Sequence, residues 1–189
     1  MSKTKKGNAT RCRIVAAARK KLVRHGVEQF VMRDLADSLQ MKLGNLQYYF
    51  NTREQLLLHL FRTEAARDLA VIGAHEKKNN APEVVFRAIV KDLVVRWRGD
   101  GGVVFSTLGT LAQHNAMYRK LYRDIYRDFY AALTGPIRQL NPKLSDDEVL
   151  LRVRLVTALV DGSPMQIQVG DTQAYLAAVQ AEAELIACR

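Results

Sequence analysis

Five side chains that can hydrogen-bond to nucleic acid lie within ten residues of one another. The segment 41–50 reads MKLGNLQYYF and contains Lys42, Asn45, Gln47, Tyr48 and Tyr49. Asparagine and glutamine carry a donor and an acceptor in one planar group, which matches the edge of adenine in the major groove. Lysine and the tyrosine hydroxyls can reach phosphate oxygens, and such contacts orient a protein on a duplex without reading its sequence. The segment predicts base contacts from the two amides and backbone contacts from the other three residues.

The alternative for the two tyrosines is burial in a core. Leu46 and Phe50 are spaced by four residues and form the apolar side of a short helix. Because that side is already occupied, we expect Tyr48 and Tyr49 to be accessible to a ligand.

The positive charge of the chain is concentrated near its N-terminus. The 189 residues carry a net charge of +10, and residues 1–63 hold 13 Lys and Arg against 4 Asp and Glu, whereas residues 64–189 hold 16 against 15. A compact basic segment on an electrically balanced body is typical of a polyanion-binding module. The alternative is a surface charge that serves only solubility.

Three short amphipathic helices are predicted in the N-terminal third. Apolar residues recur there at spacings of three and four, and Gly26 is a typical helix stop. The second and third helices are separated by only a few residues around Met41, which is the spacing of a helix-turn-helix. A generic three-helix bundle is the alternative. The apolar residues expected to form the shared core are Ile14, Ala18, Leu22, Leu35, Leu39, Leu46 and Phe50.

Residues 13–57 resemble the TetR-type bacterial transcriptional regulators. The resemblance is carried by HG at 25–26, RDLA at 33–36, GNLQYYF at 44–50 and TREQLL at 52–57, in that order. It implies an all-α protein in which a three-helix DNA-binding head with a helix-turn-helix precedes a larger C-terminal helical bundle. It also implies a regulator that binds double-stranded operator DNA as a homodimer, which favours a palindromic site.

Further contacts with the DNA backbone are expected on either side of the third helix. The residues concerned stand near helix starts, or near the N-terminus, where two lysines form a flexible arm. They are Arg33, Lys42, Thr52, Arg53, Lys5 and Lys6.

Three positions depart from the pattern of the family. Gln40 stands where a glycine usually forms the turn, so we expect either a left-handed backbone at some cost or a relaxed turn. Lys42 replaces a serine that often caps the recognition helix. Val31 leaves the second helix without a side-chain cap, a loss of about 1 kcal/mol in typical cases.

Helical periodicity continues to the end of the chain. One helix is predicted over 82–98 and ended by GDGG at 99–102. The VVFSTL that follows favours a strand by composition, but no partner strand is evident and we predict a helix. GP at 135–136 is predicted to interrupt a further helix, and SDDE at 145–148 is a capping box that opens the next.

The expected division is a DNA-binding domain over 1–62 and a ligand-binding and dimerisation domain over 63–189. The resemblance implies a repressor that is released by a small molecule bound in the second domain. Such an effector would favour a body conformation in which the two recognition helices are wrongly spaced. Coupling would run through the helix that begins at Thr52.

Tyrosine recurs at every fourth position in MYRKLYRDIYRDFYAAL, residues 117–133. With the neighbouring aliphatic residues it forms a wide apolar face with polar tips, which could line a cavity for an unknown small-molecule effector. Such a stripe is also typical of a plain core. The pocket residues predicted here are Trp97, Phe105, His114, Met117, Tyr118, Tyr122, Tyr126 and Met165.

Two C-terminal segments favour a subunit interface. Residues 149–160 are apolar almost all round, and the last helix, about 172–187, is rich in alanine, which permits close helix approach. Two such helices from each of two chains would form a four-helix interface, although both could pack inside one subunit. The predicted interface residues are Val149, Val153, Val156, Val160, Tyr175 and Val179.

Enzymatic chemistry is not predicted. The four histidines lack metal-ligand spacing, neither cysteine has an adjacent base, and GDGG lacks the lysine of a phosphate loop. We therefore expect no metal and no cofactor. Cys12 and Cys188 lie far apart, which favours a reducing, cytoplasmic setting, and no apolar run reaches the roughly 18 residues of a membrane span. The rival function is a non-specific nucleic-acid-binding or architectural protein without a ligand.

Overall fold

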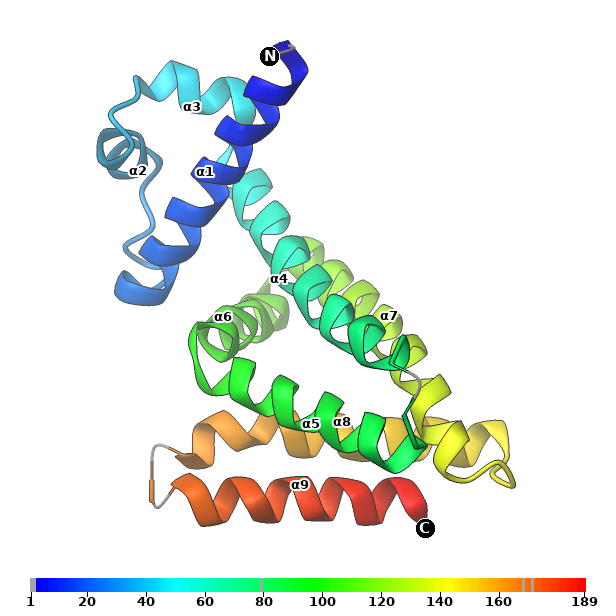
Figure 1. The fold of residues 1–189 in the computed structure, drawn as a ribbon. Helices are drawn as coiled ribbons and strands as arrows, with labels where there is room; N and C mark the ends of the chain where they lie inside the picture. Colours follow the sequence, from blue (N-terminus) through cyan, green and yellow to red (C-terminus); the bar gives the residue numbers. More distant parts are fainter. Residues whose placement is uncertain (1–2, 79, 168, 171) are drawn as a thin grey trace. The chain divides into compact units, whose positions relative to one another are not determined.

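The computed structural model describes residues 3–78, 80–167, 169–170 and 172–189. Within these residues every regular element is an α-helix, which confirms the all-α expectation (Figure 1). VVFSTL also lies in a helix, as predicted. No helix among the described residues is both long and apolar enough to cross a membrane. The helices are α1 (Lys3–His25), α2 (Met32–Ser38), α3 (Leu43–Tyr49), α4 (Arg53–Glu76), α5 (Pro82–Arg98), α6 (Asp100–His114), α7 (Ala116–Leu140), α8 (Asp146–Ile167) and α9 (Thr172–Cys188).

The chain divides into two compact units. The head unit contains Met1–Glu64 and Val104–Leu121, and the body unit contains Ala65–Val103 and Tyr122–Arg189. α4 belongs to both units, because it continues without a break past Glu64. The division into functional domains after residue 62 stays a prediction.

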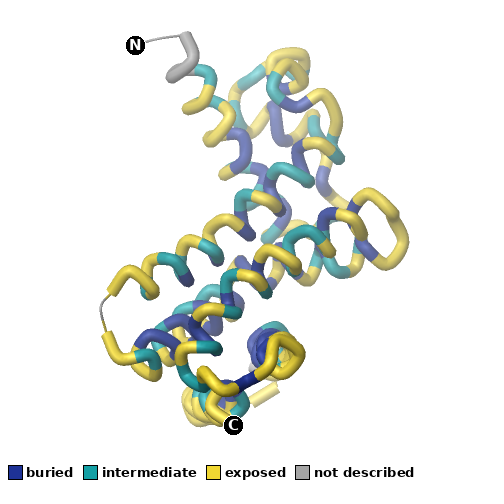
Figure 2. Tube along the Cα trace, turned by 90° about the vertical axis from the view of Figure 1, so that its right-hand side faces the viewer, coloured by how far each residue is buried: buried dark blue, intermediate teal, exposed yellow. Residues whose placement is uncertain are grey.

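The head unit is built on apolar side chains that α1, α2, α3 and α4 contribute. Ile14, Leu22, Leu35 and Leu46 have no exposed surface, in agreement with the sequence pattern. α1 ends at the predicted point because Gly26 takes φ 72°, a left-handed conformation that glycine adopts without strain. In Figure 2 buried and exposed residues alternate along the helices, as amphipathic segments require.

A buried ion pair joins two helices of the head unit. Arg19 of α1 donates from Nε to Oε2 of Glu64 at 2.8 Å and from Nη2 to Oε1 at 3.4 Å. Glu64 is only 1% exposed, so its charge is compensated by a two-point contact rather than by water. The pair fixes α1 against α4.

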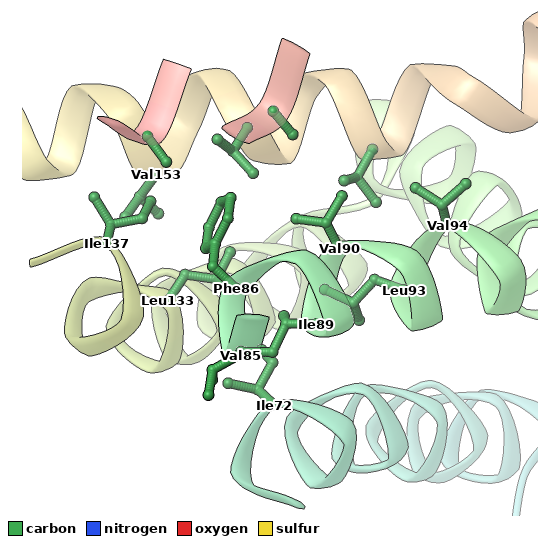
Figure 3. Packing of buried hydrophobic residues seen from close by; sticks show 14 of the residues in the cluster. Ile72, Val85, Phe86, Ile89, Val90, Leu93, Val94, Leu133, Ile137 and Val153 are labelled. Carbon is green, nitrogen blue, oxygen red and sulfur yellow. The ribbon is translucent and has the colours of Figure 1, made fainter. Parts of the chain in front are cut away.

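The core of the body unit lies between α5, α7 and α8, with α9 packed against α8 and α5. Phe86 of α5 points toward Val153 of α8, and Leu133 and Ile137 of α7 lie beside it (Figure 3). At the rim, Arg87 of α5 binds Glu184 of α9 through two hydrogen bonds of 3.0 and 2.7 Å. The capping-box prediction at SDDE also holds, because Ser145 and Glu148 bond reciprocally at the start of α8. At the start of α4, Thr52 Oγ1 accepts the Gln55 N–H.

The predicted interruption of α7 at Gly135 and Pro136 is wrong. α7 continues to Leu140 with Pro136 inside it. A proline in a helix interior costs about 3 kcal/mol, but Leu133 and Ile137 on either side of it are 1% and 0% exposed. Burying one such side chain contributes about 1.5 to 3 kcal/mol, so the shared core outweighs the local cost.

The GDGG segment forms a sharp joint rather than a loop. Gly99 ends α5, and α6 begins at Asp100. A Cβ on Gly102 would lie 2.0 Å from the carbonyl oxygen of Trp97, so only glycine permits this close approach.

Candidate nucleic-acid interface

The third helix presents its polar side chains away from the core of the head unit. Leu46 and Phe50 are 0% and 2% exposed, whereas Asn45 and Gln47 are exposed and Tyr48 is 85% exposed. α3 therefore has one side fixed by packing and another available to a ligand. This arrangement could place two amides in a major groove.

The two tyrosines have different surroundings. Tyr49 is half-buried, and its ring contacts that of Tyr48 edge to face, with 5.3 Å between the ring centres and 88° between the planes. Neither tyrosine is packed into the core. Contact of both hydroxyls with phosphates stays a prediction.

The turn between α2 and α3 resolves the question raised by Gln40. Gln40 takes φ 54°, and among the described residues it is the one non-glycine residue with a positive φ. The Gln40 N–H donates to the carbonyl of Asp37 and the Met41 N–H to that of Ala36, both at 2.9 Å. These are the two bonds of a Schellman motif, the usual helix ending with a left-handed residue. The tight turn is retained and the strain is stored at Gln40.

Neither helix of the motif has a side-chain cap. Val31 precedes α2 and Lys42 precedes α3, and both have extended backbones without a capping hydrogen bond from their side chains. Both absences agree with the sequence-based expectation. The two helices, seven residues each, are therefore held mainly by Leu35, Leu46 and Phe50.

Phe50 fixes the end of α3. The guanidinium of Arg11 lies 4.6 Å from the centre of its ring, a cation–π distance, and the ring of His59 lies 5.4 Å away. Burial lowers the pKa of His59, and the charges of Arg11 and Arg62 lower it further. His59 is consequently neutral at physiological pH and acts as an aromatic neighbour.

Arg53 and Thr52 have local roles in the structure. Arg53 donates from Nη2 to the carbonyl of Val27, which ties the start of α4 to the loop after α1. The Thr52 hydroxyl caps α4. Arg53 is half-buried, so it is less available to phosphates than the sequence suggested, whereas Arg33 and Lys42 are exposed.

The predicted arm is not separate from the head unit. α1 begins at Lys3, so the backbones of Lys5 and Lys6 are helical rather than flexible. The side chains of both lysines lie outside the described residues.

The predicted pocket residues do not form one set. Phe105, His114, Met117 and Tyr118 belong to the head unit, and Trp97, Tyr122, Tyr126 and Met165 to the body unit. Trp97 is buried and donates from Nε1 to Asp68 at 3.1 Å, and Met165 is exposed. Tyr118 is buried against Phe61.

Tyr122 and Tyr126 do line a groove of about 910 Å³ between α7 and α8. The sequence reasoning missed Asp161, Thr157 and Leu150, which line it from α8. Asp161 could have been found, because it is an acidic residue that directly follows the apolar stretch 149–160.

The valines predicted for a dimer interface lie in the core of the body unit. Val149, Val153, Val156, Val160 and Val179 are at most 2% exposed in a single chain. The four α8 valines share this core with α5, and Val179 contributes to it from α9, so little of any of them is left for a partner. Tyr175 is half-buried at the edge of the same core.

Comparison with known proteins gives a family match over part of the head unit. Residues 14–60 match the model of bacterial regulatory proteins of the tetR family. No curated protein matches the chain in sequence. The matched residues run from the core of α1 through the helix-turn-helix into α4, so this part of the chain is similar to the bacterial regulatory proteins of the tetR family.

Solved structures share the whole fold. A TetR transcription regulator from Haloarcula marismortui ATCC 43049 is 18% identical with a TM-score of 0.80, covering 95% of this chain and 97% of that chain. A protein from Saccharomonospora viridis in complex with choline is 20% identical with a TM-score of 0.74, covering 93% and 94%. A TetR transcriptional regulator from Legionella pneumophila is 16% identical with a TM-score of 0.75, covering 98% and 97%. At these identities the likeness establishes the fold alone.

Proposed function

We propose that this protein is a dimeric, sequence-specific repressor that reads a palindromic operator with α3 and is released by a small molecule bound in the body unit. One observation carries the proposal: the polar and the apolar side chains of α3 lie on opposite sides of the helix. Asn45, Gln47 and Tyr48 are exposed, while Leu46 and Phe50 hold the helix rigidly from below. Rigid placement matters because a base contact is specific only when its geometry is fixed.

The roles on α3 are distinct and can be tested separately. Replacing Gln47 or Asn45 by alanine should change sequence preference and cost roughly 1 to 3 kcal/mol on the preferred site. Tyr48→Phe should weaken binding to all duplexes alike and reduce its salt dependence, because the hydroxyl serves a phosphate. Fluorescence anisotropy with a selected operator and scrambled duplexes, over a series of salt concentrations, measures both effects. Gln139→Ala, an exposed amide in the body unit, is the matched control. Unchanged sequence preference in Gln47→Ala and Asn45→Ala would contradict the proposal.

Dimerisation is supported by the outer face of α9. Its exposed residues Ala174, Ala178, Ala181 and Leu185 follow the spacing of four, three and four, and Leu185 is 46% exposed. An exposed apolar stripe of this kind usually marks a contact. We assign the subunit interface to this stripe instead of to the buried valines.

Release by an effector rests on the continuity of α4 and on the groove between α7 and α8. α4 begins at Arg53 in the head unit and ends at Glu76 in the body unit, so a ligand that favours one body conformation could bias the head. Coupling of this type typically changes affinity about 5- to 150-fold. An effector that occupies the groove and leaves operator affinity unchanged would contradict this part of the proposal.

A second candidate function is non-specific DNA binding by charge alone. It is favoured by the 13 basic residues among residues 1–63. It differs from the first in its prediction that binding vanishes steeply with salt and shows no sequence preference.

A further inference from the structure

The groove between α7 and α8 has the size of a small-molecule site. Its volume is about 910 Å³, and all its lining residues belong to the body unit. Tyrosines from α7 form one wall, and the second wall comes from α8 and includes leucines and Asp161. The residues used below are Tyr122, Tyr126, Tyr130, Arg154 and Asp161.

Asp161 has one carboxylate oxygen with a partner and one without. The Tyr126 hydroxyl donates to Oδ2 at 2.6 Å. Oδ1 is buried and has no hydrogen-bond partner among the described residues. A buried carboxylate oxygen that accepts nothing is costly, so a native structure that retains one usually has a use for it.

The tyrosine rings lie in contact along the other wall. The ring centres of Tyr122 and Tyr126 are 4.4 Å apart, and those of Tyr126 and Tyr130 are 5.8 Å apart at 73° between the planes. Aromatic faces attract cations through their negative π-electron density, and this attraction is larger at a desolvated site than at an exposed one.

We propose that this groove binds a protonated amine with an apolar body, whose ammonium group donates a hydrogen bond to Oδ1 of Asp161 and lies against the tyrosine rings. The unpartnered oxygen requires a donor, the carboxylate favours a positive charge, and the rings and leucines accommodate the apolar part. The inference rests on the proposed function in one respect: it takes this groove to be the site at which the effector binds.

Three arginines, all of them exposed, also line the groove: Arg123, Arg127 and Arg154. Arg127 is bound to Asp124 at 3.0 Å and to Asp128 at 3.2 Å. Arg154 is exposed and interacts with the Tyr130 hydroxyl. Because exposed charges are screened by water and salt, the buried carboxylate dominates the interior of the groove. Binding of an anion at the arginines is therefore the competing outcome.

The charged and titratable groups that face Asp161 give the proposal a pH dependence. Burial raises the pKa of the Asp161 carboxyl to about 7, the hydrogen bond from Tyr126 opposes the rise, and Asp68 of α4 adds to it. Asp68 itself is bound to Arg96 at 2.5 Å. Burial also raises the pKa values of Tyr126 and Tyr130, so both remain neutral, and Arg154 is the nearby cation on α8. An amine bound below pH 7 must displace the proton of Asp161, so amine affinity should rise with pH.

The test is calorimetric titration of the full-length protein, without DNA, with four similar probes. These are 2-phenylethylammonium, its N,N,N-trimethyl derivative, 2-phenylethanol and phenylacetate. We expect the primary ammonium to bind at least tenfold more tightly than the alcohol or phenylacetate, and more tightly than the trimethyl compound, which has no N–H to donate. Its affinity should rise roughly tenfold between pH 6 and pH 8, as the ionised fraction of Asp161 increases.

Two variants locate the binding. Asp161→Asn keeps the shape of the side chain and should reduce ammonium binding at least tenfold at pH 8, remove the pH dependence, and change 2-phenylethanol binding less than twofold. Thermal unfolding of the variant confirms that it is folded. Asp147→Asn, an exposed carboxylate at the start of α8, is the matched control and should change nothing.

Three outcomes would overturn the inference. They are equal affinity for all four probes, preferred binding of phenylacetate that persists in Asp161→Asn, and binding of the trimethyl compound as tight as that of the primary ammonium. Because no DNA is present, these results are independent of operator recognition. A protein that binds the ammonium but selects no DNA sequence would refute the proposed function and leave the amine site intact.

Discussion

The head and body units place polar groups in opposite environments, exposed on α3 and buried in the groove of the body unit. On α3 the polar residues are outside and an apolar pair, Leu46 and Phe50, is inside, so each group lies where its solvation is favourable. In the groove of the body unit, Asp161 is half-buried beside tyrosines, and its Oδ1 atom is buried without a hydrogen-bond partner among the described residues. Under the proposed roles the difference has a reason: a surface that is to read DNA needs rigid support beneath exposed groups, whereas a site for a small molecule can keep an unsatisfied group for its ligand.

The strongest test of this contrast compares two aromatic residues of α3. Phe50→Ala should destabilise the head unit by about 3 to 5 kcal/mol, because it empties a buried position. Tyr48→Ala should change stability by no more than about 0.5 kcal/mol, because the side chain is 85% exposed. The only tryptophan, Trp97, lies in the body unit, so its fluorescence reports body unfolding while circular dichroism reports both units. Equal loss of stability in the two variants would mean that α3 is not supported as described.

The second prediction concerns the cost of the buried carboxylate. The native pKa of Asp161 is about 7, and that of an unfolded aspartate is about 3.9. The native state therefore binds more protons between these values, so its stability falls as pH rises from about 4 to about 7, and the whole loss is present above pH 7.

Asp161→Asn should remove that loss. The gain in unfolding free energy, followed by Trp97 fluorescence, should be near zero at pH 4 and about 2 to 4 kcal/mol at pH 8. Asp147→Asn, which is exposed, should show no such pH-dependent gain. A variant that is less stable than the parent at pH 8 would mean that Asp161 has an internal partner after all.

The third prediction addresses the outer face of α9. Leu185→Arg places a charge in the proposed interface and should convert the dimer to a monomer in sedimentation experiments, with operator affinity falling by tenfold or more. Val95→Arg alters a similarly exposed apolar residue on α5 and should leave the assembly intact. Dissociation by Val95→Arg alone would place the interface elsewhere.

The smallest expected effect is at the turn before α3. Gln40→Gly should stabilise the head unit by about 1 kcal/mol, because glycine tolerates φ 54° without the strain of a side chain. Gln40→Ala keeps the Cβ and should bring no gain. Chemical denaturation followed by circular dichroism distinguishes them, and a gain in Gln40→Ala would show that the residue is not strained by its backbone.

The sequence was informative where contacts are local. The helices, the missing caps at Val31 and Lys42, and the two sides of α3 all follow from spacings of three or four residues. It was less informative about the body unit, because a residue there is assigned to core, groove or surface by helices distant in the chain. The α8 valines were expected at an interface for this reason, although the helix turns that side toward α5.

The continuation of α7 through Pro136 was missed for the same reason. The breaking tendency of proline is local and visible, whereas the packing of Leu133 and Ile137 that offsets it depends on the tertiary structure. The pairing of Tyr126 with Asp161 joins residues 35 positions apart, which no local pattern indicates.

The most direct measurement is selection of duplex DNA from a random pool at near-physiological salt, followed by sequencing of the retained fragments. The account predicts a short palindrome, with half-sites about one helical turn apart, and altered preference within the half-site for Gln47→Ala. Retention of DNA without a motif, lost as the salt concentration rises, would contradict it and would mean that the basic charge of the head unit acts alone.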